Sequence, residues 1–327
     1  MSRKRSKVRS SRADETAHEL NEAVRTGKVI ATRVLKFRAT QQRRRRAFTR
    51  GLSAESITES RDFIPEHVAK ALGPERTTGV LIAEGDSWFD YPLNDVLRLL
   101  EDEHGFDVES VAHKGDNVED MAYSGGQFEE FARRLEKLLR AGKVPKAILL
   151  SGGGNDIAGN EFALLLNHEA SSLPPLSEEV VRGVIDLRIR DAYATIISGL
   201  TTICQRYLGR PIPIVTHGYD YPVPDGRGFM GGWGPLPGPW LRPGFIRKGH
   251  KNLETNKRLM KQLIDRFNAM IKELVALPAF SHVRYVHLLG TLATDGNYKQ
   301  YWANELHPSP KGFQMVTRQF ADLIGAL

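Results

Sequence analysis

Short apolar runs alternate with longer amphipathic stretches from about residue 77 to the C-terminus. The runs are short and mostly rich in β-branched residues, and they lack strict alternation of apolar and polar residues, as strands buried on both faces do. They are Val80–Ala83, Val108–Ala112, Ala147–Leu150, Ile212–Thr216 and Val283–Leu288. The intervening stretches predict helices over Leu93–His104, Val118–Arg140, Glu178–Tyr207, Leu253–Ala276 and Pro310–Ile324. Strands alternating with helices predict an α/β fold, a doubly wound parallel sheet covered on both faces.

The chain before residue 77 has a different pattern. Residues 1–12 are basic and polar and should be disordered, because they have little to bury. A weaker helical pattern runs from Asp14 to about Arg46, and Gly27 interrupts it. We therefore predict an N-terminal extension over residues 1–76, helical or disordered, and one domain over residues 77–327.

Charge divides the chain in the same way. Residues 1–50 carry 16 Lys and Arg against 4 Asp and Glu, whereas the remainder carries 30 against 35. A solvated helical extension is the favoured interpretation. The alternative is a weak contact with a polyanion, such as nucleic acid or an anionic membrane surface. Only Phe37 and Phe48 flank the run Arg43–Arg46, so a base-stacking surface has little support.

Composition also restricts the compartment. The single cysteine, Cys204, rules out an intrachain disulfide, and its apolar setting is typical of a buried small hydrophobe. No apolar stretch is long enough to cross a membrane, and the basic N-terminus lacks the apolar core of a signal peptide. We predict a soluble, cytoplasmic protein.

The segment from Gly218 to Gly249 follows a predicted strand and breaks the alternation. It is rich in Gly, Pro and aromatic residues. Loops of this length are usually functional or disordered, and the aromatics argue against disorder. Two interpretations stay open: a cap that shapes the substrate pocket, or a surface loop packed on itself.

Four polar sequences follow the predicted strands. They are Gly85-Asp86-Ser87, His113-Lys114-Gly115-Asp116-Asn117, Gly152-Gly153-Gly154-Asn155-Asp156 and Asn304-Glu305-Leu306-His307-Pro308. In a doubly wound sheet such loops can converge on one edge, where open α/β sheets bind their ligands.

Each sequence offers a group that acyl transfer needs. Ser87 would attack a carbonyl carbon, and His307 would take the serine proton and return it to the leaving group. The backbone N–H groups of Ser87 and Gly115 and the side-chain amide of Asn155 would form an oxyanion hole. Gly115 can present its N–H closely because it has no Cβ. One such donor contributes roughly 2.7–4 kcal/mol of transition-state stabilisation.

These four sequences resemble the blocks of the SGNH (GDSL-type) hydrolases, which are named for a Ser, a Gly, an Asn and a His. The matching residues are Ser87, Gly115, Asn155 and His307, in the same order, and the resemblance covers about residues 77–327. Each motif is weak alone; together, at strand ends, they are a strong signal. The resemblance implies a flavodoxin-like sheet and the hydrolysis of small-molecule, lipid or sugar esters, with no metal ion or cofactor.

One position departs from the family pattern. The family usually has an Asp three residues before its His, and here that residue is Asn304. An Asn in this place can favour the wrong imidazole tautomer, with losses of about 10⁴ in a serine protease. We weakly favour the adjacent Glu305 as the residue that orients His307. Asp295 and a backbone carbonyl are the alternatives.

Other Asp and His residues near the predicted loops allow alternative roles. Asp86 and Asp156 are expected to support the loops by accepting N–H groups. A metal site of Asp86, Asp116, Asp156 and His307 lacks a closely spaced ligand pair. His113, His217 and His250 also lie near predicted loops, and His217 is the second choice for the base. The departure at Asn304 keeps open a catalytically weak binding module on the same fold.

Overall fold

The computed structural model describes residues 2–50, 77–124, 126–231 and 236–327. Its centre is a sheet of five parallel strands in the order β2-β1-β3-β4-β5. The strands are β1 (Gly79–Glu84), β2 (Phe106–Ser110), β3 (Ala147–Leu150), β4 (Ile214–His217) and β5 (Val283–Val286). This is the flavodoxin-like order, so the predicted doubly wound fold is confirmed. Most strand bounds shift by a few residues from the predicted ones, and β3 agrees at both ends.

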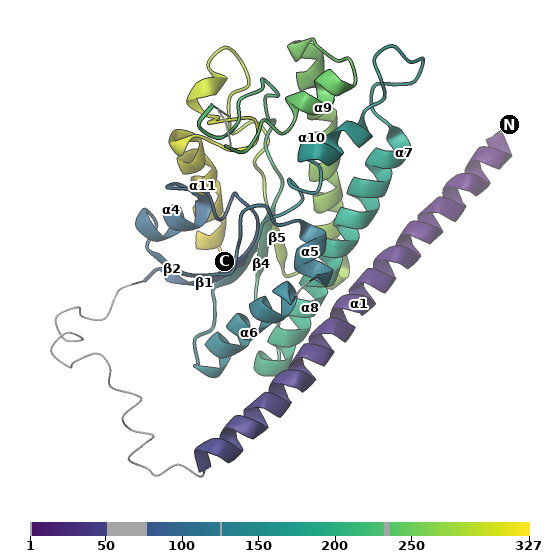
Figure 1. Cartoon of the computed structure of the whole chain (residues 1–327). Helices are drawn as coiled ribbons and strands as arrows, with labels where there is room; N and C mark the ends of the chain where they lie inside the picture. Colours follow the sequence, from purple (N-terminus) through teal and green to yellow (C-terminus); the bar gives the residue numbers. More distant parts are fainter. Residues whose placement is uncertain (1, 51–76, 125, 232–235) are drawn as a thin grey trace.

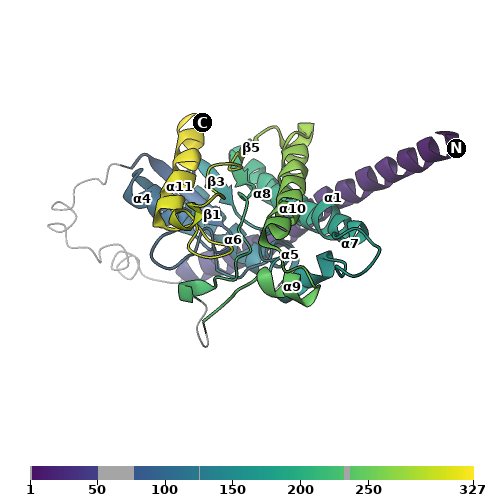
Figure 2. The same ribbon diagram turned by 90° about the horizontal axis from the view of Figure 1, so that it is seen from above.

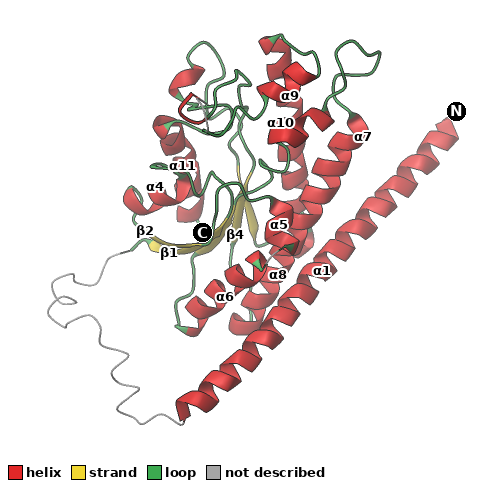
Figure 3. Cartoon of the chain, viewed as in Figure 1, coloured by secondary structure: helices red, strands yellow, loops and turns green. Residues whose placement is uncertain are grey.

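Helices cover both faces of the sheet (Figures 1 and 3). Helices α4 (Val96–Asp102) and α11 (Pro310–Gly325) lie against one face and contact each other. Around the other face lie α5 (Val118–Tyr123), α6 (Gln127–Arg140), α8 (Arg190–Leu208) and α10 (Leu253–Val275). Helix α7 (Glu178–Val181) continues through a π-helical segment, Arg182–Ile189, into α8. Helix α9 (Arg242–Arg247) lies in the long loop after β4.

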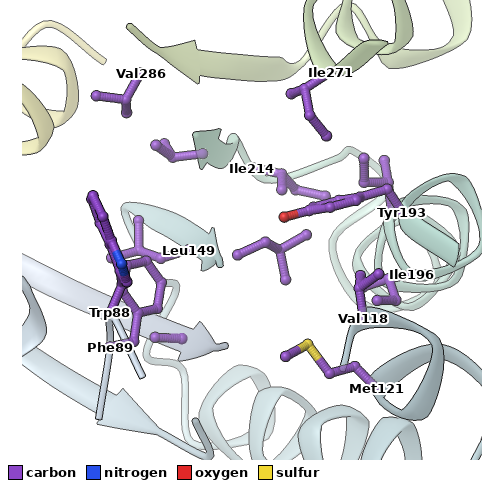
Figure 4. Close-up of a cluster of buried hydrophobic side chains, with 14 of the residues drawn as sticks. Trp88, Phe89, Val118, Met121, Leu149, Tyr193, Ile196, Ile214, Ile271 and Val286 are labelled. Atoms are coloured by element: carbon purple, nitrogen blue, oxygen red, sulfur yellow. The ribbon is translucent and has the colours of Figure 1, made fainter. Parts of the chain in front are cut away.

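The core fills both sides of the sheet (Figure 4). On one side Trp88 and Phe89 pack against Phe313 and Phe320 of α11. On the other side the side chains of α5, α8 and α10 meet the strands. The strand residues between them, such as Leu149 and Ile214, are fully buried. Burial on both faces explains why the inner strands β1, β3 and β4 read as mainly apolar runs, whereas the edge strands β2 and β5 are partly exposed and include charged residues.

Two helix predictions are corrected. The stretch Val118–Arg140 forms two helices, α5 and α6, because Gly126 takes a positive φ of 85° just before α6. At the N-terminus, residues 1–12 were expected to be disordered, but helix α1 extends from Ser2 to Arg50. Its central part docks on the domain, and a helix that is already nucleated extends at low cost.

Helix α1 lies along α8, which runs beside it over several turns (Figures 1 and 2). Gly27 does not interrupt α1, because this glycine sits at the contact. A Cβ there would come within 2.1 Å of the Thr195 carbonyl oxygen on α8. Further toward the C-terminus of α1, Arg38 donates to the buried carboxylate of Glu136 on α6 at 2.6 Å. The part of the extension over residues 51–76 lies outside the described residues.

Candidate active site

The site lies at the C-terminal edge of the sheet, where the loops after β1, β2 and β3 meet the C-terminal loop. Ser87 comes three residues after the end of β1, in a tight turn. Within this turn the Asp86 carbonyl oxygen accepts from Phe89 N at 3.0 Å, and the Asp86 side chain accepts from Trp88 N at 3.0 Å. The turn presents the Ser87 side chain to the cavity above the sheet.

The structure brings Ser87 and His307 together across 220 positions of sequence. Ser87 Oγ lies 2.7 Å from His307 Nε2. His307 stands just before α11, which begins at Pro310 and is capped by the Ser309 hydroxyl. The ring lies between two aromatic side chains. Tyr91 stacks on it with ring centres 4.3 Å apart, and Trp240 meets it edge-on at 5.5 Å.

Burial controls the charge of His307. Its side chain is 5% exposed, and loss of hydration lowers its pKa from 6.5 to about 3. A charged imidazolium is disfavoured in this setting because burial removes its water shell. The ring is therefore neutral at physiological pH, as a general base must be.

The residue behind His307 is Asn304, and Glu305 does not have that role. His307 Nδ1 lies 3.0 Å from Asn304 Oδ1. The expectation that Glu305 orients His307 is wrong, because its two oxygens are taken by the loop after β4. They accept the backbone N–H groups of Gly226, Trp240, Leu241 and Arg242 at 2.7–3.0 Å. Asp295 instead accepts the N–H of Asn297.

Gly115 and Asn155 lie beside each other near Ser87. Gly115 has a positive φ of 93°, and a Cβ there would meet nothing within 4 Å, so the turn geometry and not space requires a glycine. Asn155 lines the cavity at Ser87 and also the cleft at Gly115. Its Nδ2 donates to the Asp116 carbonyl oxygen at 2.9 Å, which fixes the amide next to the Gly115 loop.

Two aspartates hold these loops in place. Asp86 is buried and accepts from Ser151 Oγ at 2.7 Å and from the Tyr219 hydroxyl. Asp156 accepts the N–H of Val118 at the start of α5 at 2.9 Å, and burial raises its pKa to about 6. Each carboxylate therefore joins loops that follow different strands.

Two hollows open at Asn155. One is a small cavity of about 50 Å³ beside Ser87, lined mainly by apolar side chains that include Ile157, Leu263 and Phe267. The other is a wider cleft of about 520 Å³ beyond Gly115. Its lining includes Glu119, Asp120, Asp156, Glu161 and Arg188. The site thus has a narrow apolar arm and a broad polar arm.

The long loop after β4 contributes to the site in its described part. Tyr219, Asp220, Pro222 and Leu241 line the small cavity, and Trp240 covers His307. Residues 232–235, which include Trp233, lie outside the described residues. The loop is therefore packed over the site, as one of the two sequence interpretations proposed.

The other histidines are placed elsewhere. His217 is fully buried and contacts Ser151 Oγ at 2.8 Å and the Gly218 carbonyl oxygen at 2.7 Å. His250 Nε2 faces the Asn167 carbonyl oxygen. His113 is exposed, 3.5 Å from Asp116. Within the described residues, no group of three or more His, Cys, Asp or Glu side chains could hold a metal ion.

Sequence reasoning missed Tyr91, Ser151 and the role of Trp240. Tyr91 follows Ser87 by four residues, so its position in the same turn was the one available signal. Ser151 directly follows β3 and is hidden beside the glycine run Gly152–Gly154. Neither Tyr91 nor Ser151 belongs to a motif that would indicate its hydrogen-bond partner.

Comparisons with known proteins show what this chain is similar to. A family model described as GDSL-like lipase/acylhydrolase matches residues 77–315. No curated protein matches the chain. Among solved structures, a protein described as a GDSL-like lipase from Parabacteroides merdae is 15% identical with a TM-score of 0.42, covering 77% of this chain and 98% of its own. A catalytic mutant of an acetylxylan esterase from Geobacillus stearothermophilus is 15% identical with a TM-score of 0.40, covering 76% and 95%.

A last observation concerns membranes. In the part of the chain that the structure describes, none of the helices combines the length and the apolar character that a bilayer crossing requires.

Proposed function

Because the chain belongs to the GDSL-like lipase/acylhydrolase family, we propose that it is a serine esterase that hydrolyses carboxylic esters through an acyl-enzyme on Ser87. The observation that carries the proposal is the 2.7 Å contact between Ser87 Oγ and His307 Nε2. This is the distance at which a general base takes the proton of a nucleophile.

The reaction has two halves. Ser87 Oγ attacks the carbonyl carbon while His307 Nε2 takes the hydroxyl proton. The tetrahedral intermediate then expels the alcohol, which receives that proton from Nε2, and the acyl group stays on Oγ. Water attacks the acyl carbon in the same way, giving its proton to Nε2. Collapse releases the carboxylic acid and returns the proton to Ser87 Oγ.

The negative oxygen of each intermediate needs donors. We assign this role to the N–H groups of Ser87 and Gly115 and to Asn155 Nδ2. One hydrogen of the Asn155 amide already binds the Asp116 carbonyl oxygen, which holds the amide in place and leaves its second hydrogen for the substrate. Donors fixed in advance stabilise the transition state most, because they need not reorganise.

The two arms of the site suggest the substrate. The cavity of about 50 Å³ beside Ser87 is much smaller than the cleft of about 520 Å³ beyond Gly115. The small cavity suits a short acyl chain. The broad polar cleft suits an alcohol with many hydroxyl groups, so we propose short-chain acyl esters of sugars ahead of long-chain lipids.

The first test is the hydrolysis of p-nitrophenyl acetate, butyrate and octanoate by the wild type and by Ser87→Ala and His307→Ala. We expect activity on the short esters that both substitutions abolish. Activity that survives Ser87→Ala would overturn the assignment of the nucleophile. A preference for octanoate would remove the short-chain proposal but leave the mechanism intact, and acetylated sugars then test the alcohol side.

The other candidate function is a catalytically weak binding module on the same fold. Asn304 favours it, because an orienting residue without charge gives an imidazolium less support. A serine-directed organophosphonate separates the two candidates. An active esterase gains the mass of the phosphonyl group at Ser87, whereas a binding module with the same fold stays unlabelled.

We also propose that α1 makes a weak contact with a polyanion. One face of α1 is docked on α8, and the opposite face exposes Arg25, Arg33, Lys36 and Arg43 to solvent together with Phe37. Clustered cations attract polyanions, and salt weakens the attraction.

Retention on heparin tests this contact in the full chain. Replacing Arg25, Arg33, Lys36 and Arg43 by Gln should lower the salt concentration needed for elution. The control replaces four exposed cations of the domain, Lys143, Arg206, Lys251 and Arg318, by Gln. Equal shifts in both variants would remove any special role for α1.

A further inference from the structure

We infer that Asn304 completes a Ser87–His307–Asn304 triad and that Tyr91 is a positioning residue that holds the Asn304 amide with its oxygen toward His307. The inference rests on the proposed function for its kinetic consequence, but its structural content does not. It assigns Tyr91 a role that neither the motifs nor the family match indicates.

The difficulty with asparagine in this position is its two-sided amide. If the NH₂ group faced His307, Nδ1 would have to accept a hydrogen bond, and Nε2 would carry the ring proton. Nε2 could then not take a proton from Ser87 Oγ. A triad with asparagine therefore works only if something fixes which end of the amide faces the ring.

Two backbone groups fix that end here. The atom that faces His307 Nδ1 also receives the N–H of Leu306 and the N–H of His307, both at 2.9 Å. Backbone N–H groups can only donate, so this atom must be the oxygen. Nδ1 therefore donates to Oδ1 across 3.0 Å, and the lone pair of Nε2 points at Ser87 Oγ.

Tyr91 holds the other end. Asn304 Nδ2 donates to the Tyr91 hydroxyl at 3.0 Å, which gives the buried NH₂ group an acceptor that a phenylalanine could not supply. The same phenol ring stacks on the His307 ring at 4.3 Å with an angle of 22° between the planes. Phe229 and Phe313 each pack against Tyr91 at 5.8 Å and keep it in place. Tyr91 thus acts through Asn304 and His307 and touches no reacting atom.

The neutral triad has a consequence for pH. Among the residues that the structure describes, Ser87, Tyr91, Trp240 and Asn304 face His307, all uncharged at neutral pH, and the Glu305 carboxylate is turned toward the loop amides. Burial raises the pKa of Tyr91, which keeps the phenol neutral. Asn304→Asp places a negative charge beside Nδ1 and should move the acid limb of kcat/KM upward by roughly one to three pH units.

The direct test is ¹⁵N NMR of the full chain labelled at histidine, because ring-nitrogen shifts report which nitrogen carries the proton. The His307 signals are identified by their loss in His307→Gln. At pH 7 we expect a protonated Nδ1 and an unprotonated Nε2 in the wild type. Asn304→Ala should give a mixture of tautomers, and Tyr91→Phe should broaden or shift the Nδ1–H signal.

Tyr123→Phe is the matched control, because Tyr123 is half exposed on α5 and its hydroxyl contacts Thr195 Oγ1. An Nε2–H tautomer in the wild type would overturn the inference about Asn304. A Tyr91→Phe spectrum equal to that of Tyr123→Phe would overturn the role of Tyr91. With an active enzyme, Tyr91→Phe should lower kcat about tenfold with KM little changed, whereas Tyr123→Phe should change neither. An absence of ester hydrolysis would contradict only the proposed function, since the spectra need no substrate.

Discussion

Two serine–histidine pairs lie at the same edge of the sheet. In the first, Ser87 Oγ is 2.7 Å from His307 Nε2, and in the second, Ser151 Oγ is 2.8 Å from His217 Nε2. In each pair the other ring nitrogen meets an oxygen, Asn304 Oδ1 at 3.0 Å or the Gly218 carbonyl oxygen at 2.7 Å. A search for a hydroxyl beside an imidazole would find both.

The two pairs differ in the acceptors that are available to the serine proton and in whether the serine lines a cavity. Ser151 is buried, and its hydroxyl donates to Asp86 Oδ1 at 2.7 Å, so the proton is shared with a carboxylate. Asp86 also accepts from Trp88 N in the turn that carries Ser87. Ser87 itself lines a cavity. The inner pair, Ser151 and His217, therefore supports the turn that carries Ser87 of the outer pair, Ser87 and His307. A short contact between a hydroxyl and an imidazole does not by itself make a nucleophile.

The largest expected effect separates the two serines. Ser87→Ala should reduce ester hydrolysis by ~10⁴–10⁶-fold without loss of stability. Ser151→Ala should instead lower the free energy of unfolding by about 1–3 kcal/mol, because the Asp86 carboxylate and His217 lose a buried partner. Activity assays and urea denaturation of both variants measure the difference. Comparable losses of kcat in two folded variants would mean that the pairs act as one catalytic unit.

Much of the fold follows from the sequence. The inner strands, which are buried on both faces, leave mainly apolar runs, and the alternation of all five strands with helices indicates the parallel arrangement. The break before α6 could not be seen, because a glycine inside a helical pattern has no fixed outcome. Gly27 also lies inside a helical pattern, but there the helix continues, because the glycine lies at the contact with α8.

Prediction of the site was limited by contacts that come from distant parts of the chain. The Gly-Asp-Ser, Gly-rich and His-Pro motifs located Ser87, Asn155 and His307. Spacing pointed to Asn304 and the need for a carboxylate favoured Glu305 behind His307, and the loop amides that occupy Glu305 could not be foreseen from the sequence. Ser151 was invisible for the same reason, since its partners lie at the ends of β1 and β4.

The loop that places Trp240 against His307 provides the next test. In Glu305→Gln, the NH₂ end of the new amide faces two of the four loop N–H groups that the carboxylate now accepts. We expect a loss of about 2–4 kcal/mol in the free energy of unfolding. Ester hydrolysis should fall as well, because Trp240 no longer packs on His307.

Glu254→Gln is the matched control, because Glu254 is exposed and pairs with Lys257 on the surface of α10. Surface pairs of this kind contribute little, so stability and activity should both stay near the wild-type values. If Glu305→Gln were as stable as this control, the carboxylate would not be what holds the loop over the outer pair.

The smallest expected effect concerns the charge of the two histidines. The pKa of His307 is lowered from 6.5 to about 3 by burial, and that of His217 is lowered for the same reason. Below pH 6.5 the unfolded chain gains protons that the folded protein does not, so each histidine makes the folded state less stable as the pH falls. For His307 the loss is about 2 kcal/mol between pH 6.5 and 5.

This slope must be measured as a difference between variants. Burial raises the pKa of Glu84 to about 8, so the folded protein binds a proton there between pH 8 and 4.5 that the unfolded chain lacks, and this contribution has the opposite sign. Urea denaturation of the wild type and His307→Gln at pH 7, 6 and 5 cancels that term. The wild type should lose about 2 kcal/mol relative to His307→Gln on the way to pH 5, and its stability relative to His217→Gln should change in the same direction. A difference that does not vary with pH would mean that water reaches the His307 ring in solution, and the outer pair would then differ from the inner one in hydration as well as in access to substrate.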